Sequence, residues 1–256
     1  MGDIFSVTNQ KGGVGKTTTT VNLAASLANN GKKVLLIDLD PQGNASTGCG
    51  VEKDALEVSS YDVIMTAVKA ADAIVSPEGL GFDVLPTNSD MTAAEVQLLD
   101  VKLREHRLRL ALESTRDKYD YILIDCPPSL SMLTVNALVA SQGVIIPIQC
   151  EYYALEGLSS LLKTIERVKQ RANPTLDVTG LIRTMYDARN NLANEVSRQL
   201  ITHFEKKVFH AVIPRNVRLA EAPSHGVPVI SYDRSSRGSI AYMAMASEFI
   251  RRVESN

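Results

Sequence analysis

The chain has 256 residues, of which 45% are hydrophobic and 22% charged, and its formal net charge is −2. This length and composition are typical of one folded α/β domain and exclude a disordered chain, and no apolar run reaches the roughly 20 residues of a membrane span. Three cysteines without metal-ligand spacing cannot all pair, which favours a reducing cytosol.

Apolar, β-branched runs alternate with helical patterns along the chain. Strands are predicted at residues 4–8, 33–38, 82–85, 121–125, 144–149, 178–184 and 208–213, and helices at 17–29, 91–115, 130–141, 154–172, 190–204 and 237–253. This alternation predicts an α/β fold: a doubly wound, mostly parallel sheet with helices on both faces. No repeat or linker divides the pattern, so residues 1–256 are interpreted as a single domain. Residues 41–60, rich in Gly, Ser and Asn, are expected to form a mobile loop that faces the ligand.

The most informative segment is residues 11–18, Lys-Gly-Gly-Val-Gly-Lys-Thr-Thr, between the first predicted strand and the first helix. A glycine-rich turn in this setting presents backbone N–H groups and a helix N-terminus to phosphate oxygens. Gly15, Lys16 and Thr17 form the core of a P-loop, in which the lysine contacts the β- and γ-phosphates and the threonine hydroxyl binds Mg²⁺. Gln10 occupies the place of the usual first glycine, and Lys11 follows it.

Carboxylates follow two of the predicted strands. Asp38 and Asp40 belong to the segment Asp-Leu-Asp-Pro-Gln, and Asp125 ends the run Tyr-Ile-Leu-Ile-Asp, which has the form of a Walker B segment. The carboxyl ends of parallel strands meet at one edge of a sheet, and Mg²⁺ is held by carboxylates directly or through water. An isolated aspartate after a strand is equally often a helix cap, but beside a P-loop it favours a metal site.

The charge is distributed unevenly. Residues 1–170 carry 15 Lys and Arg against 21 Asp and Glu, whereas residues 171–256 carry 12 against 8. Either the difference is due to chance and to charges on solvated helix faces, or the last third of the chain presents a positive surface to a polyanion.

Together these segments resemble the deviant Walker A ATPases, and within them the ParA/Soj group that partitions chromosomes and plasmids. Residues 11–18, 38–42 and 121–128 carry the resemblance, and residues 213–218 and 221–226 (Ile-Pro-Arg-Asn-Val-Arg and Glu-Ala-Pro-Ser-His-Gly) point to ParA/Soj. The match spans essentially the whole chain, which in length resembles the chromosomal Soj type. It implies a P-loop NTPase fold and a bacterial cytoplasmic protein associated with the nucleoid.

The resemblance also implies a site for ATP and Mg²⁺. The nucleotide would be bound by Lys11, Gly12, Gly13, Val14, Gly15, Lys16, Thr17 and Thr18 at its phosphates and by Pro214 and Asn216 around adenine. The metal would lie among Thr17, Asp38, Asp40 and Asp125. The catalytic residues would be Lys11, Lys16 and Asp40, the last orienting the attacking water, because phosphoryl transfer depends mostly on positioning and electrostatics.

Three partners follow from the same resemblance. Lys11 would cross an ATP-bound homodimer to the phosphates of the other subunit, so that hydrolysis depends on dimerisation. Arg189 and Arg218 would bind double-stranded DNA without reading its sequence, and Arg215, Arg234 and Arg237 could join them. A ParB-type centromere-binding protein would stimulate hydrolysis. No membrane partner is expected.

Two other classes of protein share the loop. A MinD-like division-site ATPase would need a basic amphipathic C-terminal tail, and the final predicted helix carries Arg251 and Arg252 with three residues after Val253. A nitrogenase-type reductase would need cluster cysteines, and a biotin-pathway ligase would need a small-molecule pocket. Cys126 and Cys150 are expected to be buried thiols, and Tyr152 and Tyr153 to pack in the core.

Overall fold

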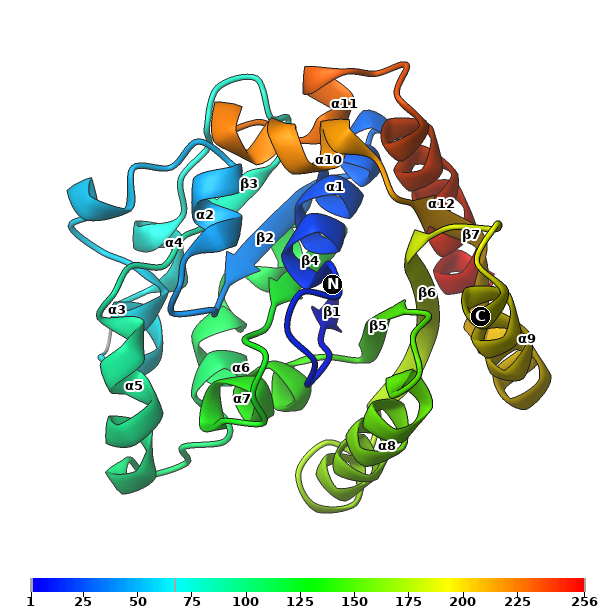
Figure 1. The fold of residues 1–256 in the computed structure, drawn as a ribbon. Coiled ribbons are helices and arrows are strands. Elements are labelled where there is room, and N and C mark those ends of the chain that lie inside the picture. The colour runs from blue at the N-terminus through cyan, green and yellow to red at the C-terminus, as the bar shows by residue number, and fades with distance from the viewer. Residues whose placement is uncertain (1, 67, 256) are drawn as a thin grey trace.

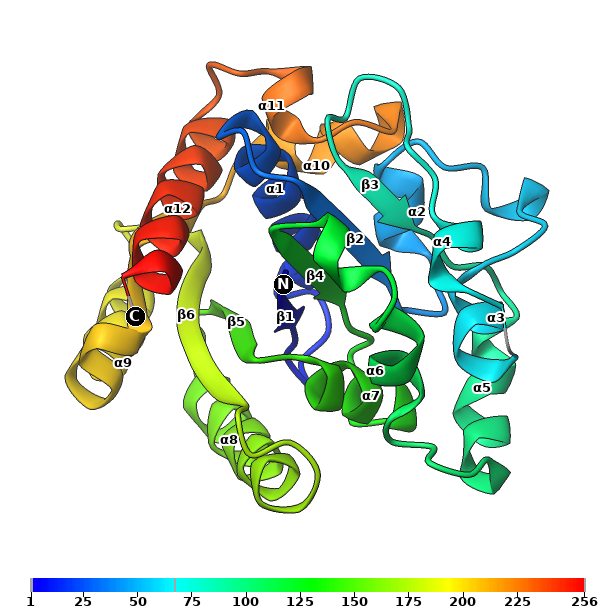
Figure 2. The same ribbon diagram turned by 180° about the vertical axis from the view of Figure 1, so that it is seen from behind.

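The computed structural model describes residues 2–66 and 68–255. Its seven strands form one parallel sheet in the order β3-β2-β4-β1-β5-β6-β7 (Figures 1 and 2). The strands are β1 Asp3–Val7, β2 Val34–Asp38, β3 Asp83–Leu85, β4 Tyr121–Asp125, β5 Gly143–Gln149, β6 Asp177–Tyr186 and β7 Val208–Pro214. Every predicted strand is present, and the predicted doubly wound fold is confirmed. The sheet was predicted to be mostly parallel, and all of the pairings between these seven strands are parallel.

The central strands are apolar because both of their faces are covered. All residues of β2 and β4 are buried, and the two strands pair in register so that Asp38 lies opposite Asp125. β1 lies between β4 and β5, where the order of the strands reverses. In open parallel sheets a ligand binds outside the carboxyl ends of the strands at such a reversal.

Helices cover both faces of the sheet. One face carries α1 Lys16–Asn29, α2 Asn44–Gly48, α10 Val217–Glu221, α11 Val229–Tyr232 and α12 Arg237–Glu254; the other carries α3 Ser60–Met65, α4 Ala70–Ala73, α5 Met91–Gln97, α6 Arg107–Leu112, α7 Met132–Ala140, α8 Ala154–Arg171 and α9 Asn191–Phe204. In Figure 1, α1, α10 and α11 lie toward the top of the view, and α7 and α8 lie toward the bottom. The Phe249 ring of α12 packs edge-on against Phe5 of β1, with centroids 4.8 Å apart. This contact fixes the C-terminal helix on the central strands.

The prediction of one continuous helix over residues 91–115 is wrong, because the structure has two separate helices there, α5 and α6. After α5 a 3₁₀ turn, Leu98–Asp100, leads into a turn in which Leu103 has a φ of +54°. Asn136 of α7 accepts a hydrogen bond from the Leu108 backbone N–H and donates one to the Arg104 carbonyl. The break is stable because a side chain from another helix bonds the backbone groups that a continuous helix would have paired.

Residues 41–60 contain more regular structure than predicted. Helix α2 lies in the segment and is followed by a 3₁₀ helix, Lys53–Ala55. The backbone N–H and hydroxyl of Ser46, inside α2, both donate to the Asp38 carboxylate. The loop is therefore bound to the end of β2, although its residues Asn44 and Thr47 do face a cavity beside the P-loop.

The three cysteines are buried and unpaired, as expected for Cys126 and Cys150. The prediction that Tyr152 and Tyr153 pack in the core is wrong, because their exposed fractions are 76% and 67%. The two rings stack edge-on at 5.0 Å in the turn between β5 and α8, where the chain has left the sheet and the buried positions of α8 begin only at Ala154.

Candidate nucleotide site

The P-loop, residues 11–18, joins β1 to α1 at the carboxyl edge of the sheet. Gly13 and Gly15 have φ angles of +71° and +86°, which a residue with a Cβ adopts only with strain. Gly15 is the N-cap of α1, and no side chain of the described residues caps this helix. The N–H groups of its first turn therefore point to an open position that suits an anion.

Two contacts fix the shape of this loop. The Lys16 ammonium lies inside it and donates to the Lys11 carbonyl at 3.2 Å, and the Thr184 hydroxyl at the end of β6 donates to the Val14 carbonyl at 2.8 Å. Burial lowers the pKa of Lys16, an effect that the charge of Asp125 opposes. Gly12 and Gly13 are exposed at the tip, and Thr18 lines the neighbouring cavity.

The three predicted carboxylates converge on the loop. Asp38 and Asp125 are fully buried and Asp40 is 7% exposed. The Thr17 hydroxyl donates to Asp125 at 2.7 Å, and the Thr20 hydroxyl donates to its other oxygen at 2.9 Å. The sequence did not single out Thr20 or Ser46, which hold Asp125 and Asp38 in place.

Burial raises the pKa of two of these carboxyl groups, Asp38 and Asp125. It raises the pKa of Asp125 to about 8, with a further contribution from the charge of Asp38, and it raises the pKa of Asp38 to about 6 against the opposing hydrogen bonds of Ser46. The charge of one buried carboxyl group disfavours ionisation of a second one beside it.

The donor set fits Mg²⁺. Within residues 2–66 and 68–255, no group of three or more His, Cys, Asp or Glu is arranged to hold a metal on its own. Mg²⁺ does not require such a group, because it keeps several waters and takes one or two carboxylates together with phosphate oxygens. Thr17, Asp125, Asp38 and Asp40 supply only hard oxygen donors, and they lie where the P-loop would place phosphates.

Lys11 points away from the interior of its own loop. Its side chain is 41% exposed, and its ammonium makes an ion pair with Glu151 in the turn between β5 and α8. Its backbone N–H is held by the Asn9 side chain, whose amide donates to the Pro147 carbonyl on β5. The loop backbone is thus fixed, while the charged end of Lys11 lies at the surface.

A mostly apolar cavity of about 460 Å³ adjoins the P-loop. Its walls include the predicted adenine residues Pro214 and Asn216 together with Gly15 and Thr18, and also Thr184, Met185, Ile213, Arg215, Val217, Leu219, Ala220 and Tyr242. The cavity is large enough for a purine and a sugar. Thr184 could have been found from its position at a predicted strand end, but Tyr242 lies inside a predicted helix and only the tertiary structure brings it here.

The three predicted DNA-binding arginines do not all lie in one place. Arg189 and Arg215 line a groove of about 850 Å³ between the loop after β6, the end of β7 and the start of α12, and Arg237 lines it as well. The Arg189 side chain is 91% exposed and pairs with Asp187, which holds the pKa of that aspartate down to about 2.

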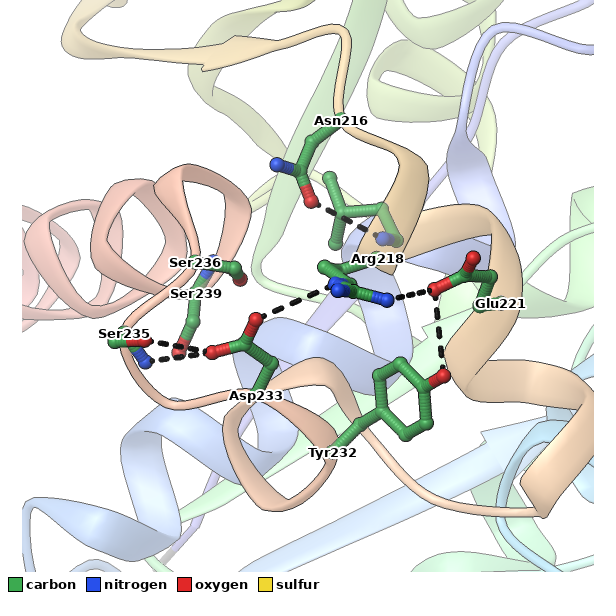
Figure 3. Close-up of polar contacts among 9 residues, drawn as sticks. Asn216, Arg218, Glu221, Tyr232, Asp233, Ser235, Ser236 and Ser239 are labelled. Carbon is green, nitrogen blue, oxygen red and sulfur yellow. Dashed lines mark hydrogen bonds and ion pairs between the residues drawn. The ribbon is translucent and has the colours of Figure 1, made fainter.

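Arg218 lies outside the lining of this groove, on α10, and two carboxylates hold it (Figure 3). Its Nη1 is 2.7 Å from Glu221 and its Nε is 3.4 Å from Asp233. Tyr232 also donates to Glu221, and Ser235 donates to Asp233. The predicted residues therefore form one convergent nucleotide site and a separate set of arginines in two different environments.

Comparison with known proteins agrees with this geometry. The family model described as AAA domain matches residues 2–178, a range that contains the P-loop and all three carboxylates. The chain is 52% identical over 248 residues to the sporulation initiation inhibitor protein Soj of Bacillus subtilis (strain 168), covering 97% of this chain and 98% of that protein. It is 50% identical over 251 residues to the chromosome partitioning protein ParA of Caulobacter vibrioides (strain NA1000 / CB15N), covering 97% and 94%.

A solved structure is similar over the same span. Cobyrinic acid a,c-diamide synthase from Mycobacterium smegmatis, with a bound ATP analogue and magnesium, superposes with a TM-score of 0.87 at 37% identity and covers 100% of this chain and 97% of its own. The superposed span therefore contains the P-loop, the strand-end carboxylates and the C-terminal arginines of this chain.

Proposed function

Because this chain belongs to the AAA domain family and, within it, to the Soj/ParA group of chromosome partitioning ATPases, we propose that it is an ATP-dependent DNA partition protein acting as a single domain. The observation that carries the proposal is the convergence, at one sheet edge, of a P-loop and three strand-end carboxylates beside a groove lined by arginines. We place the protein in the bacterial cytoplasm, on the nucleoid.

In this function the P-loop residues bind the phosphates of ATP, with Lys16 contacting the β- and γ-phosphates. Thr17, Asp125, Asp38 and Asp40 hold Mg²⁺, which neutralises charge on the phosphoryl oxygens when bound. Asp40 orients the attacking water: one oxygen accepts the Gln42 backbone N–H at 3.0 Å, and the other has no hydrogen-bond partner among the described residues. Pro214 and Asn216 enclose adenine in the apolar cavity.

Hydrolysis depends on a homodimer in which Lys11 reaches the phosphates bound by the second copy. The position of its ammonium supports this role, because it lies at the surface on Glu151 rather than inside its own loop. An exposed ion pair is worth at most about 1 kcal/mol, so Lys11 can exchange Glu151 for a phosphate at little cost. A cation that arrives only on dimerisation stabilises the transferring group as an arginine finger does.

The dimer binds double-stranded DNA without sequence preference, and a ParB-type protein stimulates hydrolysis and so releases it. The arginine-lined groove supports the DNA contact, because phosphates are bound through charge and without reading base edges. Pro214 and Arg215 line both this groove and the nucleotide cavity, so a bound nucleotide lies against one wall of the DNA groove.

The proposal is tested by sedimentation with and without DNA, in ATP and in ADP. We expect DNA retention with ATP only, and we expect Asp40→Ala to retain DNA persistently because it binds ATP but does not position the water. Normal ATP turnover by Asp40→Ala would contradict the role given to Asp40, and equal retention in ATP and ADP would contradict the switch.

The MinD-like alternative predicts co-sedimentation with liposomes in ATP. The apolar face of α12, with Tyr242, Met245 and Phe249, is buried against the sheet and is not presented to a bilayer. Within the described residues, no helix has the length and apolar character to cross a membrane.

A ligase is a second candidate, because the M. smegmatis structure bears the name of a diamide synthase. We do not expect DNA to change the rate of ATP turnover by a ligase. ATP turnover that rises with a small carboxylate substrate and stays unchanged with DNA would favour it.

A further inference from the structure

Residues 221–226, Glu-Ala-Pro-Ser-His-Gly, form a turn of defined shape after α10. The 3₁₀ helix Ala222–His225 follows α10 directly and ends at Gly226, whose φ is +65°. The His225 ring stacks on the Tyr232 ring of α11, with centroids 4.9 Å apart. The short helix and the ring contact together hold Gly226 in a fixed position.

Gly226 meets the end of α2 through backbone atoms. Its partner is Gly50, two residues beyond α2, with a φ of +73°. A Cβ on Gly226 would lie 2.7 Å from the Gly50 Cα, and a Cβ on Gly50 would lie 3.0 Å from the Gly226 carbonyl oxygen. Both positions therefore need glycine for two reasons, the positive φ and the close approach. In Figures 1 and 2 the orange segment beyond α10 lies next to α2.

Helix α2 in turn holds a carboxylate of the metal site. The Ser46 backbone N–H and hydroxyl donate to one oxygen of Asp38, at 2.8 Å and 2.7 Å. The Ser46 carbonyl accepts the Val51 backbone N–H at 3.0 Å, which ties the turn at Gly50 back to the serine. The orientation of the Asp38 carboxylate therefore depends on where α2 lies.

Helix α2 is only partly supported on the side of the turn. A cavity of about 310 Å³ lies between α1, α2 and the turn, and its walls include Asn44 and Thr47 of α2 and Ala222 and Pro223 of the turn. Open space offers no atoms to oppose a movement of the helix. The backbone contact between the two glycines supplies support that the cavity lacks.

The other end of the same segment lies at the nucleotide cavity. Leu219 and Ala220 of α10 line that cavity, and the turn begins two residues later. Asn216 caps α10 by accepting the Leu219 backbone N–H, a contact that does not involve Gly226. A disturbance at Gly226 should therefore reach α2 and the metal end of the site and leave the base end in place.

We infer that Gly50 and Gly226 are positioning residues for the magnesium site: their contact seats α2, and α2 orients Asp38 through Ser46. The inference rests on the proposed function, because it deepens the role given there to Asp38. It assigns to residues 221–226 the task of joining the base end of the nucleotide site to its metal end.

The test compares the affinity of the full chain for a non-hydrolysable ATP analogue in Mg²⁺ and in EDTA, by isothermal titration. The ratio of the two affinities measures what the metal contributes. We expect Gly226→Ala, and the milder Gly50→Ala, to lower this ratio by about tenfold, as the loss of a partner behind a metal ligand does. The affinity in EDTA should stay the same, because the P-loop and the adenine cavity are not disturbed.

Gly79→Ala is the matched control. Gly79 has a φ of +80°, so alanine there meets the same backbone strain, but its Cβ would have nothing within 4 Å. The ratio should be unchanged in this variant. In an Asp38→Asn background, adding Gly226→Ala should lower the ratio no further, because both changes act on the same carboxylate.

The outcomes separate the inference from the proposed function. Failure of the unmodified protein to bind the analogue, or binding that does not depend on Mg²⁺, would count against the proposed function itself. Mg²⁺-dependent binding by the unmodified protein, with the same ratio in Gly226→Ala and Gly50→Ala, would overturn the inference alone. Equal losses in Mg²⁺ and in EDTA would also overturn it, since they would show a general effect on the fold. If Gly226→Ala does not fold, Gly50→Ala decides.

Discussion

At the scale of single residues, the buried pair Asp38 and Asp125 makes the ligand-free protein sensitive to pH. Both pKa values are raised above the unfolded value, so between about pH 4 and pH 8 the folded chain holds more protons than the unfolded chain. The contribution of these two groups to the free energy of unfolding is therefore fully present below their pKa in the unfolded chain. It is lost as the pH rises through their pKa values in the folded chain.

We predict that the free energy of unfolding of the nucleotide-free protein falls by several kcal/mol between about pH 5 and pH 9, most of it from Asp125. Urea unfolding at several pH values measures it. Asp125→Asn should flatten the profile, since the amide does not titrate, whereas Asp54→Asn at an exposed position should leave it unchanged. A profile as steep in Asp125→Asn as in the unmodified chain would show that other groups cause the dependence.

At the scale of elements, the contact between α10 and α12 shapes the nucleotide cavity. A Cβ on Gly238 would lie 2.7 Å from the Leu219 side chain and 3.1 Å from the Asn216 amide oxygen. Asn216 caps α10 by accepting the Leu219 backbone N–H. Glycine at 238 is therefore what lets the first turn of α12 approach the helix that lines the cavity.

We predict that Gly238→Ala displaces α10 and weakens binding of an ATP analogue by about tenfold, the effect of some 1.4 kcal/mol. Isothermal titration of the analogue, without DNA, measures it. Gly157→Ala is the matched control, because a Cβ there meets nothing within 4 Å and α8 takes no part in the cavity. Equal affinities in the two variants would mean that α10 tolerates the shift.

At the scale of the whole molecule, the position of Lys11 predicts an active site completed by a second copy. A mixture of Lys11→Ala and Asp40→Ala proteins, each inactive alone, should regain ATP turnover, because a mixed pair contains one site with its own Asp40 and the other copy's Lys11. In an equimolar mixture with random pairing, half of the pairs are mixed and one site in each is complete, which is about a quarter of all sites. Steady-state turnover across mixing ratios measures this, and no recovery at any ratio would place Lys11 in its own site.

The sequence alone determined the fold class, all seven strands and the P-loop, because a strand buried on both faces needs a continuous apolar run and a phosphate loop needs glycine at fixed spacing. It also placed Asp38, Asp40 and Asp125 at one edge, since strand ends of a parallel sheet converge.

Only the tertiary structure decided which polar groups meet. The break at Leu103 depends on Asn136, more than thirty residues away, and the exposure of Tyr152 and Tyr153 depends on where α8 docks. Likewise, Arg215 and Arg218 are three residues apart and equally basic in sequence. One stands in an open groove and the other between two carboxylates, because a side chain's partners are set by the elements that pack around it.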